Sequence, residues 1–193
     1  MDVSTLERSC DVARGVITNV TPPTYDQPTP CVSWNVKEVL NHLVGATHWF
    51  ADSMGQQEET SDHDAAAAGT DFTGTDVQAS FNEGAKRAIE AFSSPGALEQ
   101  MVSLPFGDMP GAAFLTLAVN DVLTHSWDLA KATGQDTNLD PELATELLGM
   151  MQQSLPDQFR GPEGSGAPFG PAREAPGAAS PADQLAAFLG REV

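Results

Sequence analysis

The residues best suited to bind a metal or transfer protons are four histidines, His42, His48, His63 and His125. Asp121 precedes His125 by four residues, so in a helix the two side chains lie on one face, about one turn apart. Two metal ligands from a single helix need this spacing. The pair is therefore the first candidate for a metal site.

The spacing alone is a weak signal. Asp and Glu make up 27 of the 193 residues, so an acid stands four residues before a given histidine by chance about one time in seven. The alternative is a surface or capping Asp121 beside a buried, hydrogen-bonded His125. However, His125 continues an apolar stripe with Val122 and Leu129, which directs it toward the core. An aspartate beside such a face is unfavourable unless it is paired or bound to a cation, and this favours the metal site.

A third ligand is expected from another helix. His42 lies at the edge of the apolar face of its own helix, and metal sites in helical bundles are built from inward side chains of facing helices. His48 is six residues further on, about 240° around the helix, and is predicted to lie on the surface. His63 stands in an acidic stretch and is expected to be solvated.

The elements that must position these residues are helices. Apolar residues recur at three- and four-residue spacing, which predicts helices over residues 4–20, 35–54, 76–93 and 111–133, a fifth from residue 141 and a short last one over 180–189. Local signals support the starts, with capping boxes predicted at Ser4 with Glu7 and at Asn35 with Glu38. Gly134 suits the end of the fourth helix.

The connections are long. Residues 21–30 contain four prolines and are predicted to be extended. Residues 55–75 form an acidic crossover loop, and residues 156–179 are rich in proline and glycine and should be irregular. The sequence therefore predicts one all-α domain over 1–193, a four-helix bundle with long crossover loops and short C-terminal helices.

The net charge is −18, which makes nucleic acids and anionic membranes poor partners. There is no signal-peptide pattern and no run of apolar residues long enough to span a bilayer, so the cytoplasm is expected.

The two cysteines are too few for a disulfide scaffold, and Cys10 falls on an apolar stripe as a buried thiol. Neither cysteine belongs to a CxxC motif, and no serine elbow or phosphate-binding glycine loop occurs. Trp34, Trp49 and Trp127 are read as core or pocket wall.

Three blocks of this sequence resemble one known family, the N-terminal domain of mycothiol-dependent maleylpyruvate isomerase, which belongs to the DinB-like metal-binding bundles. The blocks are Thr29-Pro30-Cys31 through Trp34-Asn35-Val36 with Leu40-Asn41-His42-Leu43-Val44-Gly45, then His125-Ser126-Trp127-Asp128-Leu129-Ala130 with Thr133-Gly134, and the stretch from Pro181 to Arg191, which is similar to actinobacterial single-domain members.

The resemblance implies a DinB-like four-helix bundle with a three-ligand metal site, formed here by His42, Asp121 and His125. The family usually has glutamate at the position of Asp121, so the shorter aspartate would bring the metal nearer to its helix or bind it through water. No separate C-terminal domain is expected, whereas the isomerase has one. Two imidazoles and one carboxylate leave coordination positions open, as in catalytic zinc sites, and an open zinc ionises a bound thiol near neutral pH.

These observations support three hypotheses. The first is a metal-dependent enzyme that activates a low-molecular-weight thiol such as mycothiol, either to transfer the thiol to a substrate or to isomerise the substrate. Its partners would be that thiol and an electrophilic substrate. Zinc is the expected metal, although nickel or ferrous iron would also accept these ligands. The second is a metal-binding module without turnover, for sensing, storage or partner binding. The third is a bundle whose histidines are structural, and a homodimer is left open in all three.

Overall fold

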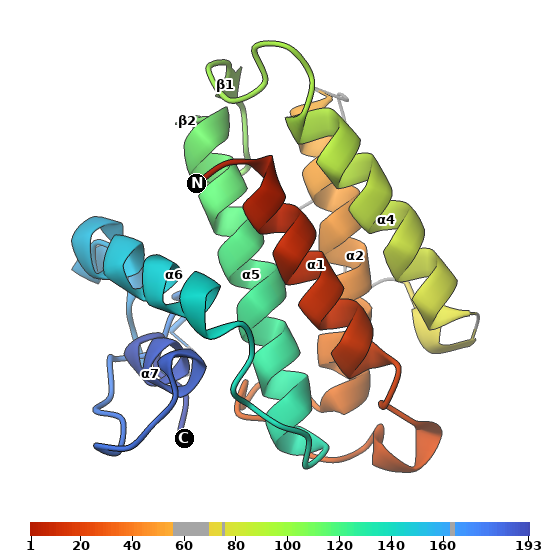
Figure 1. The fold of residues 1–193 in the computed structure, drawn as a ribbon, viewed down its shortest axis with the longest axis vertical. Coiled ribbons are helices and arrows are strands. Elements are labelled where there is room, and N and C mark those ends of the chain that lie inside the picture. The colour runs from red at the N-terminus through yellow and green to blue at the C-terminus, as the bar shows by residue number, and fades with distance from the viewer. Residues whose placement is uncertain (56–69, 75, 163–164) are drawn as a thin grey trace.

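The computed structural model describes residues 1–55, 70–74, 76–162 and 165–193. A bundle is formed by four helices, α1 (Val3–Ile17), α2 (Val36–Met54), α4 (Val77–Phe92) and α5 (Gly111–Ala132). Both α1 and α2 pack against α4 and α5 (Figure 1). The predicted all-α bundle is confirmed, and each of these helices begins and ends within three residues of its prediction.

Two further helices, α6 (Pro141–Ser154) and α7 (Pro181–Phe188), pack against each other beside α5, outside the bundle (Figure 1). Between them, residues 155–162 and 165–180 are irregular apart from the 3-10 turn η3 (Asp157–Phe159) and one bridge between Arg160 and Phe169. The irregular character predicted for this stretch is confirmed over these residues. A small antiparallel pair, β1 (Met101–Val102) and β2 (Met109–Pro110), connects α4 to α5. Strands of two residues are too short to show an alternating pattern, so the sequence did not predict them.

The start of α2 is determined by its own sequence. Asn35 accepts a hydrogen bond from the Glu38 backbone N–H at 2.9 Å, and the Glu38 carboxylate accepts one from the Asn35 N–H at 2.8 Å. This is the predicted capping box, and it is confirmed. Because the first turn is held in this way, the direction of every later side chain on α2, His42 included, follows from helical geometry.

The structure differs from the local predictions at three points near the N-terminus. Helix α1 is capped by Asp2, whose carboxylate accepts from the Ser4 N–H at 2.9 Å, rather than by a Ser4–Glu7 box. The helix also ends at Ile17, three residues before its predicted end, and the hydroxyl of the capping residue Thr18 donates to the Arg14 carbonyl at 2.8 Å. The proline-rich stretch over 21–30 is not simply extended, since Pro22–Thr24 forms a 3-10 turn (η1).

An aromatic cluster joins three helices at one end of the bundle. The Phe114 ring of α5 lies 5.3 Å from Trp49 and 5.5 Å from Phe50 of α2, and 5.7 Å from Phe92 of α4, measured between ring centroids. Phe114 is fully buried. These contacts fix α2 against α5 and so set which of their residues face each other. Cys10 is also buried in this core, as predicted.

The described part of the 55–75 connection packs on α2. The 3-10 turn η2 (Phe72–Gly74) begins with Phe72, whose backbone N–H donates to the Asn41 side chain at 2.9 Å. Residues 56–69 and 75 lie outside the described residues, and so does the predicted position of His63.

Candidate metal centre

His42 comes from the middle of α2 and is almost completely buried, with 1% of its surface exposed. The Trp34 ring, from the residue just before the α2 cap, lies 4.5 Å from the His42 ring and 5.6 Å from the His125 ring. Trp34 therefore covers both imidazoles and forms a wall of this site, in agreement with its interpretation as a pocket wall.

Asp121 and His125 come from successive turns of α5, as their spacing predicted. The Asp121 Oδ1 atom lies 3.3 Å from His42 Nε2 and 3.7 Å from His125 Nε2. The two imidazole rings are 4.6 Å apart and meet edge to face. The structure thus brings together all three residues that the sequence singled out, although His42 and Asp121 are 79 residues apart in the chain.

The spacing of these atoms fits a metal ion. One ligand atom from each side chain lies within 4.8 Å of the other two. Two ligands of a tetrahedral zinc lie about 3.3 Å apart, because each bond to the metal is about 2.0–2.1 Å long. The distances of 3.3 and 3.7 Å are close to this value, so the geometry of the three side chains is compatible with a cation between them.

A hydrogen bond on the far side of His125 defines which of its nitrogens faces the site. His125 Nδ1 donates to Asp128 Oδ2 at 2.9 Å, one turn further along α5. Metal-binding histidines typically donate their second ring N–H to a carboxylate in this way, which fixes the tautomer and leaves the other nitrogen as the ligand. This bond leaves His125 Nε2 directed toward Asp121 and His42.

Asp128 is completely buried and is also bound by Arg191 from the C-terminal end of the chain. The guanidinium donates from Nε to Oδ1 at 3.3 Å and from Nη2 to Oδ2 at 3.2 Å. Burial on its own raises the pKa of the Asp128 carboxyl, but the Arg191 charge and the His125 hydrogen bond outweigh it and hold this pKa below its ordinary value. Asp128 is therefore an ionised acceptor for the imidazole.

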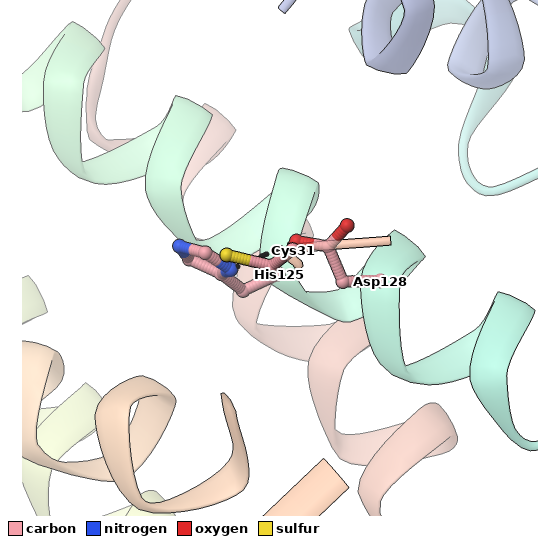
Figure 2. Close-up of side chains that lie close together, drawn as sticks. All are labelled: Cys31, His125 and Asp128. Atoms are coloured by element: carbon pink, nitrogen blue, oxygen red, sulfur yellow. Dashed lines mark hydrogen bonds and ion pairs between the residues drawn. The ribbon is translucent and has the colours of Figure 1, made fainter. Parts of the chain in front are cut away.

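Cys31 lies at the edge of the same group, before the start of α2. Figure 2 shows its sulfur beside the His125 ring, and its Sγ, a nitrogen of His125 and an oxygen of Asp128 lie within 4.8 Å of one another. Such a trio has the composition of a metal site. However, Arg191 already neutralises the Asp128 carboxylate, so a second cation beside it would face an adjacent positive charge. The His42, Asp121 and His125 group is the better candidate.

The remaining histidine that can be placed, His48, lies away from the centre, as its position on the helix predicted. It is not a surface residue, however, and that prediction was wrong. Its ring is half-buried, with Nε2 3.2 Å from the Ser80 carbonyl oxygen and Nδ1 3.1 Å from an Arg87 nitrogen, because α4 packs over this face of α2. His48 therefore holds two helices together.

Sequence reasoning missed three residues around the site. Asp128 could have been found, since it lies three residues after His125 and such pairs are neighbours on a helix. Cys31 and Arg191 stand in blocks that resemble the family, but no spacing relates either residue to His125, because each reaches the centre only through the packing of its segment.

Two buried histidines and one carboxylate between facing helices are the arrangement from which helical bundles build metal sites. The comparison with known proteins identifies the family of this bundle. Residues 6–130 match the model of the mycothiol maleylpyruvate isomerase N-terminal domain. The chain belongs to this family, as the sequence resemblance indicated.

Relatives and solved structures extend this result. Uncharacterized proteins from two strains of Mycobacterium tuberculosis are each 38% identical over 195 residues, which covers 97% of this chain and 96% of theirs. The crystal structure of mycothiol-dependent maleylpyruvate isomerase has a TM-score of 0.54 at 13% identity, covering 66% of this chain and 58% of the isomerase. The match to this structure therefore spans little more than half of the isomerase chain.

A DinB-like protein from Bacillus subtilis has a TM-score of 0.51 at 16% identity, covering 68% of this chain and 89% of its own. At such low identity these two structures establish the fold alone, and the fold is that of a DinB-like bundle. Among the described residues, no helix combines the length and apolar character needed to cross a membrane.

Proposed function

We propose that this protein binds one divalent metal ion through His42, Asp121 and His125 and uses it in thiol chemistry. The co-substrate would be a low-molecular-weight thiol of the mycothiol type. The enzyme would either transfer this thiol to an electrophilic small molecule or use it to isomerise such a molecule. The observation that carries the proposal is the convergence of three ligand atoms within 4.8 Å in a family named for a mycothiol-dependent isomerase.

The donor set favours zinc, although nickel and ferrous iron also accept two imidazoles and a carboxylate. When bound in a site with an open position, such a cation lowers the pKa of a thiol to near neutrality and so supplies a thiolate at cellular pH. The cytoplasm, where low-molecular-weight thiols are kept reduced, is the compartment that this proposal requires.

The protein's own residues would prepare the site. Asp128 holds the Nδ1 proton of His125 and keeps Nε2 as the donor atom. The Trp34 ring lies over both histidines and shields them from water on that side. Asp121 and His125 keep about a tenth of their side chains exposed, whereas His42 is closed off. A thiol would therefore approach on the side of Asp121 and His125.

The test combines metal content with turnover. Protein purified without added metal is analysed for its elements, stripped with a chelator and reloaded with zinc. Each form is then mixed with mycothiol and monobromobimane, whose fluorescence reports attack by the thiolate. We expect about one metal per chain, a rate above that of the stripped protein, and loss of both in Asp121→Ala. His48→Ala, a histidine outside the centre, is the matched control.

Two results would overturn the proposal in different ways. A metal content near zero that His42→Ala does not change would remove the metal centre and leave structural histidines. One metal per chain with no rate above the stripped protein would remove the thiol chemistry. It would leave a metal-binding module for sensing, storage or partner binding.

A further inference from the structure

The buried ion pair behind His125 joins the candidate centre to the far end of the chain. Arg191 is 9% exposed and makes two hydrogen bonds to Asp128, which is 0% exposed. A third donor, Nη1, bonds the Leu189 carbonyl at 3.3 Å. The guanidinium is thus held in one orientation by the chain end on one side and by the Asp128 carboxylate on the other.

Local structure after α7 directs Arg191 inward. Gly190 has a φ of +97°, a left-handed conformation that glycine adopts without strain. The turn is closed by a hydrogen bond from the Arg191 N–H to the Ala186 carbonyl at 2.9 Å. A Cβ at Gly190 would lie 2.5 Å from the Gly170 Cα, so a larger residue does not fit here. The turn at Gly190 therefore directs the chain after α7 back toward α5.

A second contact holds the same two segments together. Trp127 Nε1 donates to Asp183 Oδ1 at 2.8 Å, so α7 is anchored on α5 one residue before Asp128. The family match ends at residue 130, and both Asp183 and Arg191 lie beyond it. The part of the chain beyond the matched residues 6–130 thus contacts the motif that carries His125.

A carboxylate buried without a partner is strongly destabilising, which is why removing one member of a buried ion pair is far more harmful than losing an exposed one. Without Arg191, the Asp128 side chain would have to turn toward water or rearrange, and its bond to His125 Nδ1 would weaken or break. An imidazole that loses this acceptor is no longer held in one tautomer or one ring orientation.

We infer that Arg191 is a positioning residue of the metal centre: through Asp128 it orients His125, so that the segment after α7 completes a site whose ligands all lie in the bundle. The effect on metal affinity rests on the proposed function. The effect on the His125 imidazole does not, and the two are measured separately.

The experiment compares Arg191→Ala, Arg191→Lys and Arg160→Ala in the full chain. Arg160 is the matched control, because it also secures the C-terminal segment, but its hydrogen bonds go to the Gly170 and Phe188 carbonyls rather than to Asp128 or His125. Zinc affinity is measured by competition with a chromophoric chelator. Nitrogen-15 NMR of the imidazoles in the metal-free protein reports the tautomer of His125.

We expect Arg191→Ala to weaken zinc binding about 10–100-fold, the usual effect of removing a residue that supports a metal ligand. Arg191→Lys should lie between this and the wild type, because a lysine keeps the charge but not the two parallel hydrogen bonds. In the wild type, His125 should be a single Nδ1–H tautomer, and in Arg191→Ala a mixture. Arg160→Ala should lower the melting temperature and leave both readouts unchanged.

Equal zinc affinity and an unchanged His125 tautomer in Arg191→Ala would overturn the inference, as would an equal loss of affinity in Arg160→Ala. If the wild type binds no zinc, the proposed function fails, and the tautomer of His125 in the metal-free protein still decides the role of Arg191. If Arg191→Ala does not fold, Arg191→Lys supplies the comparison.

Discussion

The exchange of His42 for alanine tests the metal centre most directly, because the same helix carries a control. His42 and His48 both lie on α2, and both contact other helices. Only His42 contributes an atom to the three-residue group. We expect His42→Ala to remove most of the stabilisation by zinc, and His48→Ala to retain it even though its own melting temperature falls.

The size of the effect follows from linkage. Zinc at 100 times its dissociation constant stabilises the folded protein by about 2.7 kcal/mol. For a chain of this length, 1 kcal/mol moves the melting temperature by about 2–4 °C, so zinc should raise it by about 5–11 °C. Loss of a supporting residue already weakens binding by about 10–100-fold, and loss of a direct ligand should weaken it at least as much. At a 100-fold loss the stabilisation falls to about 0.4 kcal/mol, or about 1 °C.

The assay is differential scanning calorimetry of each protein, stripped of metal and then reloaded at the same zinc concentration. Comparing each variant with its own metal-free form removes the effect of the cavity that the substitution leaves. A zinc-induced rise in His42→Ala as large as that of the wild type would refute the assignment. So would a loss of that rise in His48→Ala.

Three further predictions concern the fold. Phe114→Ala should destabilise the protein by about 3–5 kcal/mol in urea unfolding, because the ring is fully buried among aromatic side chains. The exposed Phe106→Ala should change stability by less than about 0.5 kcal/mol, and equal effects would contradict the packing argument. Asn35→Ala should lower the melting temperature by about 2–4 °C through the loss of the α2 cap, whereas Asn138→Ala, in an exposed loop, should not. Burial raises the pKa of Cys10 from 9.0 to about 12. Above pH 9 the unfolded chain therefore releases a proton that the folded protein keeps, and the free energy of unfolding should fall by about 1.4 kcal/mol per pH unit until about pH 12. This part of the pH dependence should be absent from Cys10→Ala, and its persistence there would show that another group causes it.

The helices could be predicted because their signals are local. Apolar residues at helical spacing define the buried face of each helix, and capping residues such as Asn35 and Ser180 satisfy backbone groups within their own first turn. The errors arose where local signals compete. Asp2, not Ser4, caps the first turn of α1. The prolines of residues 21–30 are compatible with a tight turn as well as with an extended chain, and Pro22–Thr24 forms such a turn.

For the centre, the sequence by itself determined that Asp121 and His125 share a face of one helix, since four residues make about one turn. The meeting of His42 with this pair was an expectation until the packing of α2 on α5 placed its Nε2 3.3 Å from Asp121. That Arg191 lies against Asp128 was decided by the tertiary structure alone. Contacts between distant segments depend on how whole helices pack, and no spacing along the chain encodes which partner a buried charge will meet.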